Sequence, residues 1–158
     1  MMPKEQLYSI VYQQVEELIA DETDTIANMA NVAALLHETF GFWWTGFYRV
    51  LDNQLVLGPF QGPLACTRIP FGRGVCGTAW QRRATIVVPD VEQFPGHIAC
   101  SSESRSEIVV PMYASANKTT DDAENKVTAV LDIDSRELCT FDETDRLWLE
   151  KITALMAK

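Results

Sequence analysis

The sequence contains no uninterrupted apolar segment of about 18 residues, so we expect no membrane-spanning helix. Basic residues are also few: 13 Lys and Arg stand against 22 Asp and Glu, and the net charge of −9 argues against nucleic acid and anionic membranes as partners. The phosphate-binding patterns G-x-x-x-x-G-K-[ST] and G-x-G-x-x-G and the hydrolase pattern G-x-S-x-G are absent. Residues 1–6 lead directly into an amphipathic segment, and we therefore expect no signal peptide.

What the sequence does contain is enough apolar material for a folded core. The chain has 158 residues, of which 47% are hydrophobic, and we expect one domain over residues 1–158. Its four cysteines, without a signal for export, point to a reducing compartment and hence to the cytoplasm. Persistent disulfides are rare there, whereas transient ones are usually catalytic or sensory.

Three of the cysteines lie in short segments rich in glycine, proline and charged residues rather than in apolar runs. Cys66, Cys76 and Cys100 follow the spacing C-x9-C-x23-C without a C-x2-C pair, which does not fit the common zinc frameworks. This leaves thiol chemistry, in which one cysteine attacks and one or two others resolve the product. Cys76 should lie in the first turn of a helix after Gly74, where the helix dipole favours a thiolate. Cys139 precedes the last helix and is interpreted as a small hydrophobic residue.

The hydrophobic pattern predicts an α+β fold. Helical spacing of apolar residues predicts two N-terminal helices, and Asp142 is a suitable N-cap for a last helix that turns Trp148 and Ile152 inward. A glycine-rich turn indicates a short helix within 72–81. Strands are predicted at 42–50, 54–57, 85–88, 108–113 and 127–133, with a polar loop between the last two. We expect these elements to form a central antiparallel sheet with the N- and C-terminal helices on one face and a ligand pocket on the other.

Three carboxylates are expected to meet at one end of this sheet. Along 127–134, alternation puts Asp132 and Asp134 on one face and the apolar residues on the other, namely Val127, Ala129, Leu131 and Ile133. Glu107 begins the preceding strand, and antiparallel pairing brings that start beside the two aspartates. Crowded carboxylates raise at least one pKa, which leaves an acid able to donate a proton near neutral pH. A solvated strand end whose acids cap turns would also explain the pattern, but the nearness of Cys100 favours a site.

Two further features leave alternatives open. Trp43 and Trp44 are adjacent, so within a strand one of them must face the side opposite the other. An aromatic residue at such a position is more often part of a core than of a ligand wall. His97 lies three residues before Cys100 and would suit a Cys–His dyad, although an ordinary structural or surface histidine is the simpler interpretation.

Several segments resemble the free methionine-(R)-sulfoxide reductases, which have the GAF fold. They read GFWWTGFY (41–48), ACTRIPFGRGVCG (65–77), PGHIAC (95–100), SRSEIVVP (104–111) and LDIDS (131–135). The resemblance runs from the first helix to the last, and the three-cysteine pattern is specific to this branch of the fold. The chain departs from the family pattern in a longer hairpin loop at 115–125 and in Thr128-Ala129, where an aliphatic-Gly pair is usual; neither touches the proposed chemistry.

For the cysteines, the resemblance implies that Cys100 attacks the sulfur of free methionine-(R)-sulfoxide and becomes a sulfenic acid. Cys66 or Cys76 then condenses with it to a disulfide, which thioredoxin reduces. No metal or organic cofactor is implied. Proteins of this kind often pair through their terminal helices, which makes a homodimer an expectation as well.

For the other matching residues, the resemblance implies substrate contacts. Glu107 and Asp134 would deliver a proton to the sulfoxide oxygen, Asp132 would hold the substrate, and Trp44 would contact its methyl end. A rival interpretation is a GAF sensor of a small ligand such as a cyclic nucleotide, but a sensor requires an output domain and has no use for three cysteines in loops. A cysteine redox switch without turnover is a third alternative, which steady-state turnover would distinguish.

Overall fold

The computed structural model describes residues 1–98, 100, 103–115 and 125–157. Within them, one antiparallel sheet has the strand order β3-β2-β1-β6-β5-β4. Its strands are β1 (Trp44–Leu51), β2 (Gln54–Gln61), β3 (Arg68–Pro70), β4 (Ile86–Val88), β5 (Ser106–Tyr113) and β6 (Val127–Ser135). The helices are α1 (Lys4–Ile19), α2 (Thr25–Phe40), α3 (Gly74–Arg82) and α4 (Glu143–Met156), with a short 3₁₀ helix η1 (Val91–Gln93).

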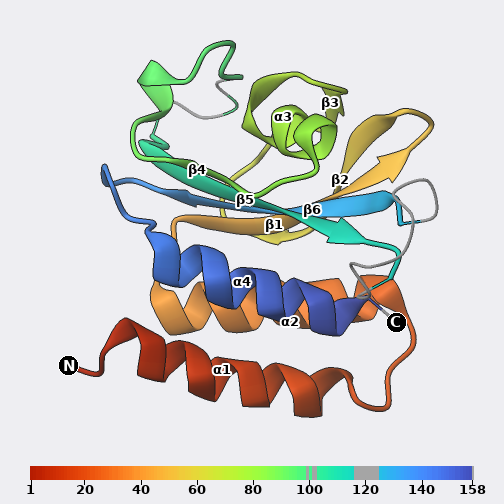
Figure 1. Cartoon of the computed structure of the whole chain (residues 1–158), viewed down its shortest axis with the longest axis vertical. Helices are drawn as coiled ribbons and strands as arrows, with labels where there is room; N and C mark the ends of the chain where they lie inside the picture. Colours follow the sequence, from red (N-terminus) through yellow and green to blue (C-terminus); the bar gives the residue numbers. More distant parts are fainter. Residues whose placement is uncertain (99, 101–102, 116–124, 158) are drawn as a thin grey trace.

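The helices lie on both faces of the sheet (Figure 1). α2 and α4 lie against one face and α1 lies beyond them, whereas α3 covers the opposite face. Each face has its own apolar core: Phe47 and Leu131 pack towards α2 and α4, while Trp44, Tyr48 and Val109 pack towards α3. The expected α+β sheet with the N- and C-terminal helices on one face is therefore confirmed. We find no helix in the described part of the chain that is long and apolar enough to cross a membrane.

Most predicted elements are present, with ends shifted by a few residues. The strand predicted at 54–57 continues to Gln61, and β3 was not predicted, because a three-residue strand ending in proline carries little periodic signal. Asp142 caps α4 as expected: its carboxylate accepts hydrogen bonds from the backbone N–H groups of Thr144 and Asp145. Most of the long polar loop predicted between β5 and β6 lies outside the described residues.

The prediction for Val127 is wrong. Met112 pairs with Ala129 but Tyr113 pairs with Val127, so one extra residue, Thr128, interrupts the β5–β6 register. An inserted residue reverses the alternation of side chains beyond it. Ala129 consequently lies in the core beside α2 and α4, whereas Val127 belongs to the core on the α3 side.

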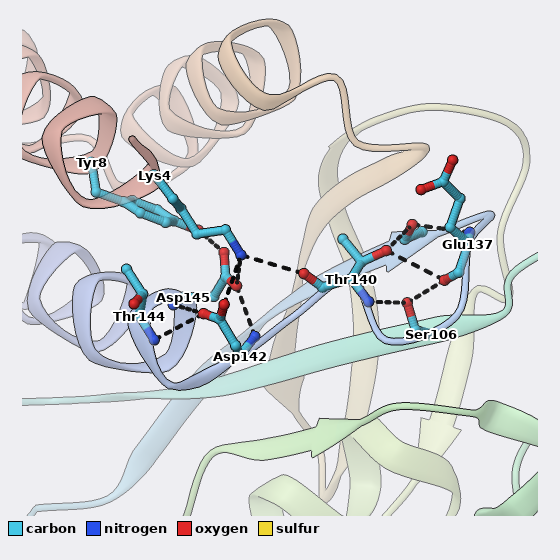
Figure 2. Close-up of polar contacts among 9 residues, drawn as sticks. Lys4, Tyr8, Ser106, Glu137, Thr140, Asp142, Thr144 and Asp145 are labelled. Carbon is cyan, nitrogen blue, oxygen red and sulfur yellow. Dashed lines mark hydrogen bonds and ion pairs between the residues drawn. The ribbon is translucent and has the colours of Figure 1, made fainter. Parts of the chain in front are cut away.

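A buried polar cluster fastens α1 to the start of α4 (Figure 2). The Asp145 carboxylate is 1% exposed and accepts a hydrogen bond from the Tyr8 hydroxyl at 2.7 Å, while the Lys4 ammonium lies 2.7 Å from its other oxygen. The backbone N–H of Asp142 donates to the same carboxylate and closes a capping box. Both carboxylate oxygens of Asp145 have partners, so the cost of removing the carboxylate from water is offset. The same contacts fix α1 against the start of α4.

A second group of hydrogen bonds fixes the turn after β6 against the start of β5 (Figure 2). The Ser106 hydroxyl donates to the backbone carbonyl of Glu137 at 2.6 Å, and the Thr140 hydroxyl donates to the side-chain hydroxyl of Ser135 at 2.6 Å. Ser106 and Ser135 are themselves paired across β5 and β6. These contacts fix the sheet end next to Glu107 and Asp134.

Candidate active site

A pocket opens between the sheet and α3. Its floor comes from β5 and β6, and one wall comes from the start of β1. Its cover comes from the first turn of α3 and from residues 64–65, 97–98, 100 and 104. Every residue singled out from the sequence lines this pocket except Cys66, which is joined covalently to a lining residue. These residues are Trp44, Cys76, Cys100, Glu107, Asp132 and Asp134.

The three carboxylates meet as the strand pairing predicted. Glu107 is directly opposite Asp134 across β5 and β6, and Asp132 is the next residue of β6 on the same face. Glu107 and Asp132 are 5% and 6% exposed. Two of the three acids are therefore buried and Asp134 is half-buried beside them, so the alternative of a solvated strand end is wrong.

Burial and the neighbouring charges raise the pKa values of the three carboxyl groups by different amounts. Burial, followed by the charges of Asp132 and Asp134, raises the pKa of Glu107 well above its ordinary value. Burial and the charge of Asp132 do the same to the pKa of Asp134, although the Ser104 hydroxyl, which donates to its carboxylate at 2.7 Å, opposes that shift. Burial also raises the pKa of Asp132, but hydrogen bonds from Glu107 and Cys76 stabilise its charged form. Asp132 is thus the acid that ionises most readily, and Glu107 and Asp134 hold protons.

Cys66 and Cys100 form a disulfide with their Cα atoms 5.4 Å apart. The bridge joins the loop after β2 to the loop before β5, 34 residues apart in the chain. The Tyr48 hydroxyl donates to the carbonyl of Cys66 at 2.9 Å and fixes the first of these loops against β1. A dithiol pair at the mouth of an acidic pocket can be oxidised and reduced without moving the sheet.

Cys76 is a free thiol in the first turn of α3, 4% exposed. The expectation of a thiolate there is wrong. Burial, and then the charges of Asp132 and Glu107, raises the pKa of Cys76 well above its ordinary value, and its side chain is hydrogen-bonded to Asp132. Desolvation and two neighbouring acids outweigh the helix dipole, which is worth about 0.3–1 kcal/mol in exposed settings. The protonated Cys76 thiol therefore joins Asp132 and Glu107 in one hydrogen-bonded network.

Both adjacent tryptophans face the pocket, contrary to the prediction that one must face away. β1 begins at Trp44, so Trp43 precedes the regular strand and is not bound by its alternation. The Trp44 indole N–H donates to the carbonyl of Pro63 at 3.0 Å, and the ring stacks on Phe60 with centroids 5.2 Å apart. A Cβ at Gly46 would lie 2.6 Å from the Trp44 ring, so glycine is required for this ring position.

His97 lines the pocket beside Glu107 rather than completing a dyad with Cys100. Its Nε2 lies 3.8 Å from a Glu107 carboxylate oxygen, and burial lowers the pKa of the imidazole. Ser104, the partner of Asp134, was not singled out as a site residue from the sequence. Its signals there were a position between Cys100 and Glu107 and its place at the start of the family-like segment 104–111, since a loop serine carries no periodicity.

Known proteins resemble this chain over nearly its whole length. Residues 16–158 match the family model described as GAF domain. The chain is 54% identical to GAF domain-containing protein A of Dictyostelium discoideum (97% of this chain, 92% of that protein). It is 42% identical to the free methionine-R-sulfoxide reductase of Escherichia coli (99% and 90%). A solved structure of the free methionine-R-sulfoxide reductase of Neisseria meningitidis in complex with its substrate matches with a TM-score of 0.90 and 53% identity (99% and 90%). The chain therefore belongs to the GAF-domain family and, within it, to the free methionine-R-sulfoxide reductases.

Proposed function

We propose that this oxidoreductase converts free methionine-(R)-sulfoxide to methionine by thiol chemistry at Cys100. The observation that carries the proposal is the placement of the Cys66–Cys100 disulfide at the rim of a pocket whose floor holds two protonated acids, Glu107 and Asp134. Reduction of a sulfoxide requires a nucleophile for sulfur and a proton for oxygen, and this pocket offers both.

The substrate is held by charge at one end and by aromatic surface at the other. Asp132 accepts the ammonium group, because it is the acid that ionises most readily and its Oδ1 is buried without a hydrogen-bond partner among the described residues. Trp44, fixed by Pro63 and Phe60, contacts the methyl end of the side chain, and Trp43 widens that wall. A pocket that encloses the ammonium group favours the free amino acid over a residue within a peptide.

In the first half-reaction, the thiolate of reduced Cys100 attacks the sulfoxide sulfur. A protonated carboxyl, from Glu107 or Asp134, delivers its proton to the sulfoxide oxygen, which is otherwise a poor leaving group. The substrate S–O bond then breaks and the oxygen bonds to the Cys100 sulfur, while the bond between Cys100 and the substrate sulfur breaks, so methionine leaves and Cys100 becomes a sulfenic acid. The substrate sulfur is reduced by two electrons and the cysteine sulfur is oxidised by two.

In the second half-reaction, the Cys66 thiol attacks the sulfenic sulfur and releases water, which forms the disulfide. Cys66 is the preferred resolving residue because it is the partner of Cys100 in the structure. Cys76 is less suited, since its raised pKa keeps the nucleophilic thiolate scarce. A dithiol protein of the thioredoxin type then reduces the disulfide, which suits a cytoplasmic enzyme. Pairing of two copies through the terminal helices stays a prediction.

The test is turnover by the purified protein with dithiothreitol as reductant and the separated R and S epimers of free methionine sulfoxide. We expect methionine from the R epimer, little from the S epimer, and little reduction of the same sulfoxide inside a peptide. The Cys139→Ser variant is the matched control, since Cys139 is exposed and outside the pocket, and should match the unaltered protein. A peptidyl sulfoxide reduced as fast as the free amino acid would refute the enclosed-substrate proposal. Binding of methionine sulfoxide without turnover would favour a redox switch or sensor.

A further inference from the structure

The inner end of the pocket brings three metal-binding side chains close together, with His97 beside one of them. The Cys76 sulfur and carboxylate oxygens of Glu107 and Asp132 all lie within 4.8 Å of one another. The Nε2 atom of His97 is 3.8 Å from a Glu107 carboxylate oxygen. The thiol and both acids are at least nine-tenths buried, and they come from α3, β5 and β6, so their backbones are fixed by regular structure.

These distances suit a small tetrahedral cation. Zinc binds cysteine sulfur at about 2.3 Å and histidine nitrogen or carboxylate oxygen at about 2.0–2.2 Å, which separates neighbouring donors by roughly 3.3–3.8 Å in a tetrahedron. The ligand atoms of Cys76, Glu107 and Asp132 need to approach one another by up to roughly 1.5 Å through side-chain rotation. The His97 ring, 3.8 Å from Glu107, must also turn towards the other two to become a fourth ligand.

A second observation points to a ligand at this place. The Oδ1 atom of Asp132 is buried and has no hydrogen-bond partner among the described residues. A buried carboxylate oxygen without a partner is costly, and a bound cation would satisfy it. The mixture of one sulfur, one imidazole nitrogen and two carboxylates favours zinc over magnesium and calcium, which select oxygen donors alone.

We propose that Cys76, Glu107, Asp132 and His97 form a binding site for a single zinc ion at the inner end of the pocket. The ion is a ligand that occupies the pocket, not a cofactor of the reaction, so the expectation of metal-free catalysis is unaffected. Because the site uses neither Cys66 nor Cys100, the form with the disulfide closed retains it. Binding of the ion releases the protons of Cys76 and Glu107 and competes with the substrate ammonium group for Asp132, so zinc would inhibit the proposed reaction. The binding experiments below do not require turnover and therefore test the site separately.

The experiment uses the protein with the disulfide closed and with Cys139→Ser, so that Cys76 is the one remaining free thiol. This background is titrated with Co²⁺, a coloured substitute for zinc, and then with Zn²⁺. We expect one equivalent of Co²⁺ to produce thiolate-to-cobalt charge-transfer absorption, and one equivalent of Zn²⁺ to abolish it. Mg²⁺ in excess should leave the absorption unchanged.

Two variants test the ligands individually. Cys76→Ser in the same background should lose the charge-transfer absorption and weaken zinc binding by more than roughly 10²-fold, beyond the 10–100-fold that loss of an outer-shell partner usually causes. His97→Ala, a partly exposed loop position, should weaken it by roughly 10-fold or more while the thermal melting curve is preserved. The inference is overturned if the background protein binds no Zn²⁺ in equilibrium dialysis. It is equally overturned if either variant, with a native circular dichroism spectrum, binds zinc as tightly as the background. Should Cys76→Ser fail to fold, His97→Ala and Asp132→Asn decide the matter.

Discussion

Glu107 and Asp134 face each other across neighbouring strands, with both side chains in the same pocket. Like charges at directly opposed positions destabilise a strand pair, so the arrangement favours a proton on at least one of the two carboxyl groups. Burial acts in the same direction, and both pKa values lie well above those of ordinary carboxyl groups. The β5–β6 pairing therefore favours protonated carboxyl groups at the place where the proposed reaction requires a proton donor.

The first prediction concerns this pair in the chemical step. Glu107→Gln and Asp134→Asn should each slow single-turnover release of methionine by roughly 10²–10⁴-fold, because each removes a candidate general acid. The double variant should lose far less than the product of the two factors, since residues that act as a unit are not additive. Asp132→Asn, which removes the ammonium partner, should act mainly on KM. Near-normal rates in both single variants would mean that the proton comes from another group.

The second prediction concerns stability against pH. Because the pKa of Glu107 is higher in the folded than in the unfolded protein, its contribution to stability is fully present below the unfolded pKa and is lost as pH rises through the folded pKa. The side chain introduced by Glu107→Gln cannot ionise, so this variant should lose less free energy of unfolding than the unaltered protein as pH rises over that range. The difference should be up to about 1.4 kcal/mol for each pH unit between the folded and unfolded pKa values. Urea unfolding of the disulfide form across this pH range measures the difference.

The matched control for that experiment is Glu17→Gln, an exposed glutamate on α1. Its unfolding free energy should follow that of the unaltered protein at every pH. Parallel pH profiles for Glu107→Gln and the unaltered protein would contradict the assignment of a protonated, buried Glu107.

Sequence reasoning located the carboxylates correctly because strand alternation and antiparallel pairing are simple geometric rules. Asp132 and Asp134 are two positions apart in a strand, and no other packing could move them to different faces without a bulge between them. The same rules failed at Val127 and at Trp43, where a bulge and the end of a strand interrupt the alternation. Neither Thr128 nor Trp43 is a glycine or proline, so the sequence contained no residue that would predict an interrupted alternation at these positions.

The protonation state of Cys76 illustrates a different limit. The sequence correctly indicated the start of a helix, and a helix start favours a thiolate. The deciding factors, burial under the pocket and the neighbouring charges of Asp132 and Glu107, arise from segments more than 30 residues away along the chain. Such tertiary contacts cannot be read from local spacing.

The third prediction concerns the cluster that joins α1 to α4. Tyr8→Phe removes a buried hydrogen bond to a charged acceptor and should lower the free energy of unfolding by about 1.5–3 kcal/mol. Asp145→Asn should cost more, because it also leaves the Lys4 ammonium without its nearest partner. Glu143→Gln is the matched control in the same helical turn, and its exposed contact with Arg146 should contribute almost nothing. Urea unfolding measures all three.

These variants also separate structure from chemistry. Under conditions where each variant is folded, the rate of methionine formation per folded molecule should be unchanged, since the cluster lies on the opposite side of the sheet from the pocket. A specific loss of turnover in folded Tyr8→Phe would mean that the outer helix contributes to the active site in a way that this account does not include.

Single-turnover release of methionine from the cysteine variants tests the central claim most directly. Reduced protein is mixed with less than one equivalent of free methionine-(R)-sulfoxide, without added reductant, and methionine is quantified. Cys100→Ser should release none, whereas Cys66→Ser, Cys76→Ser and Cys139→Ser should each release close to the stoichiometric amount, with only Cys66→Ser leaving a persistent sulfenic acid for a trapping reagent. A stoichiometric burst of methionine from Cys100→Ser would contradict the assignment of the nucleophile and with it the proposed mechanism.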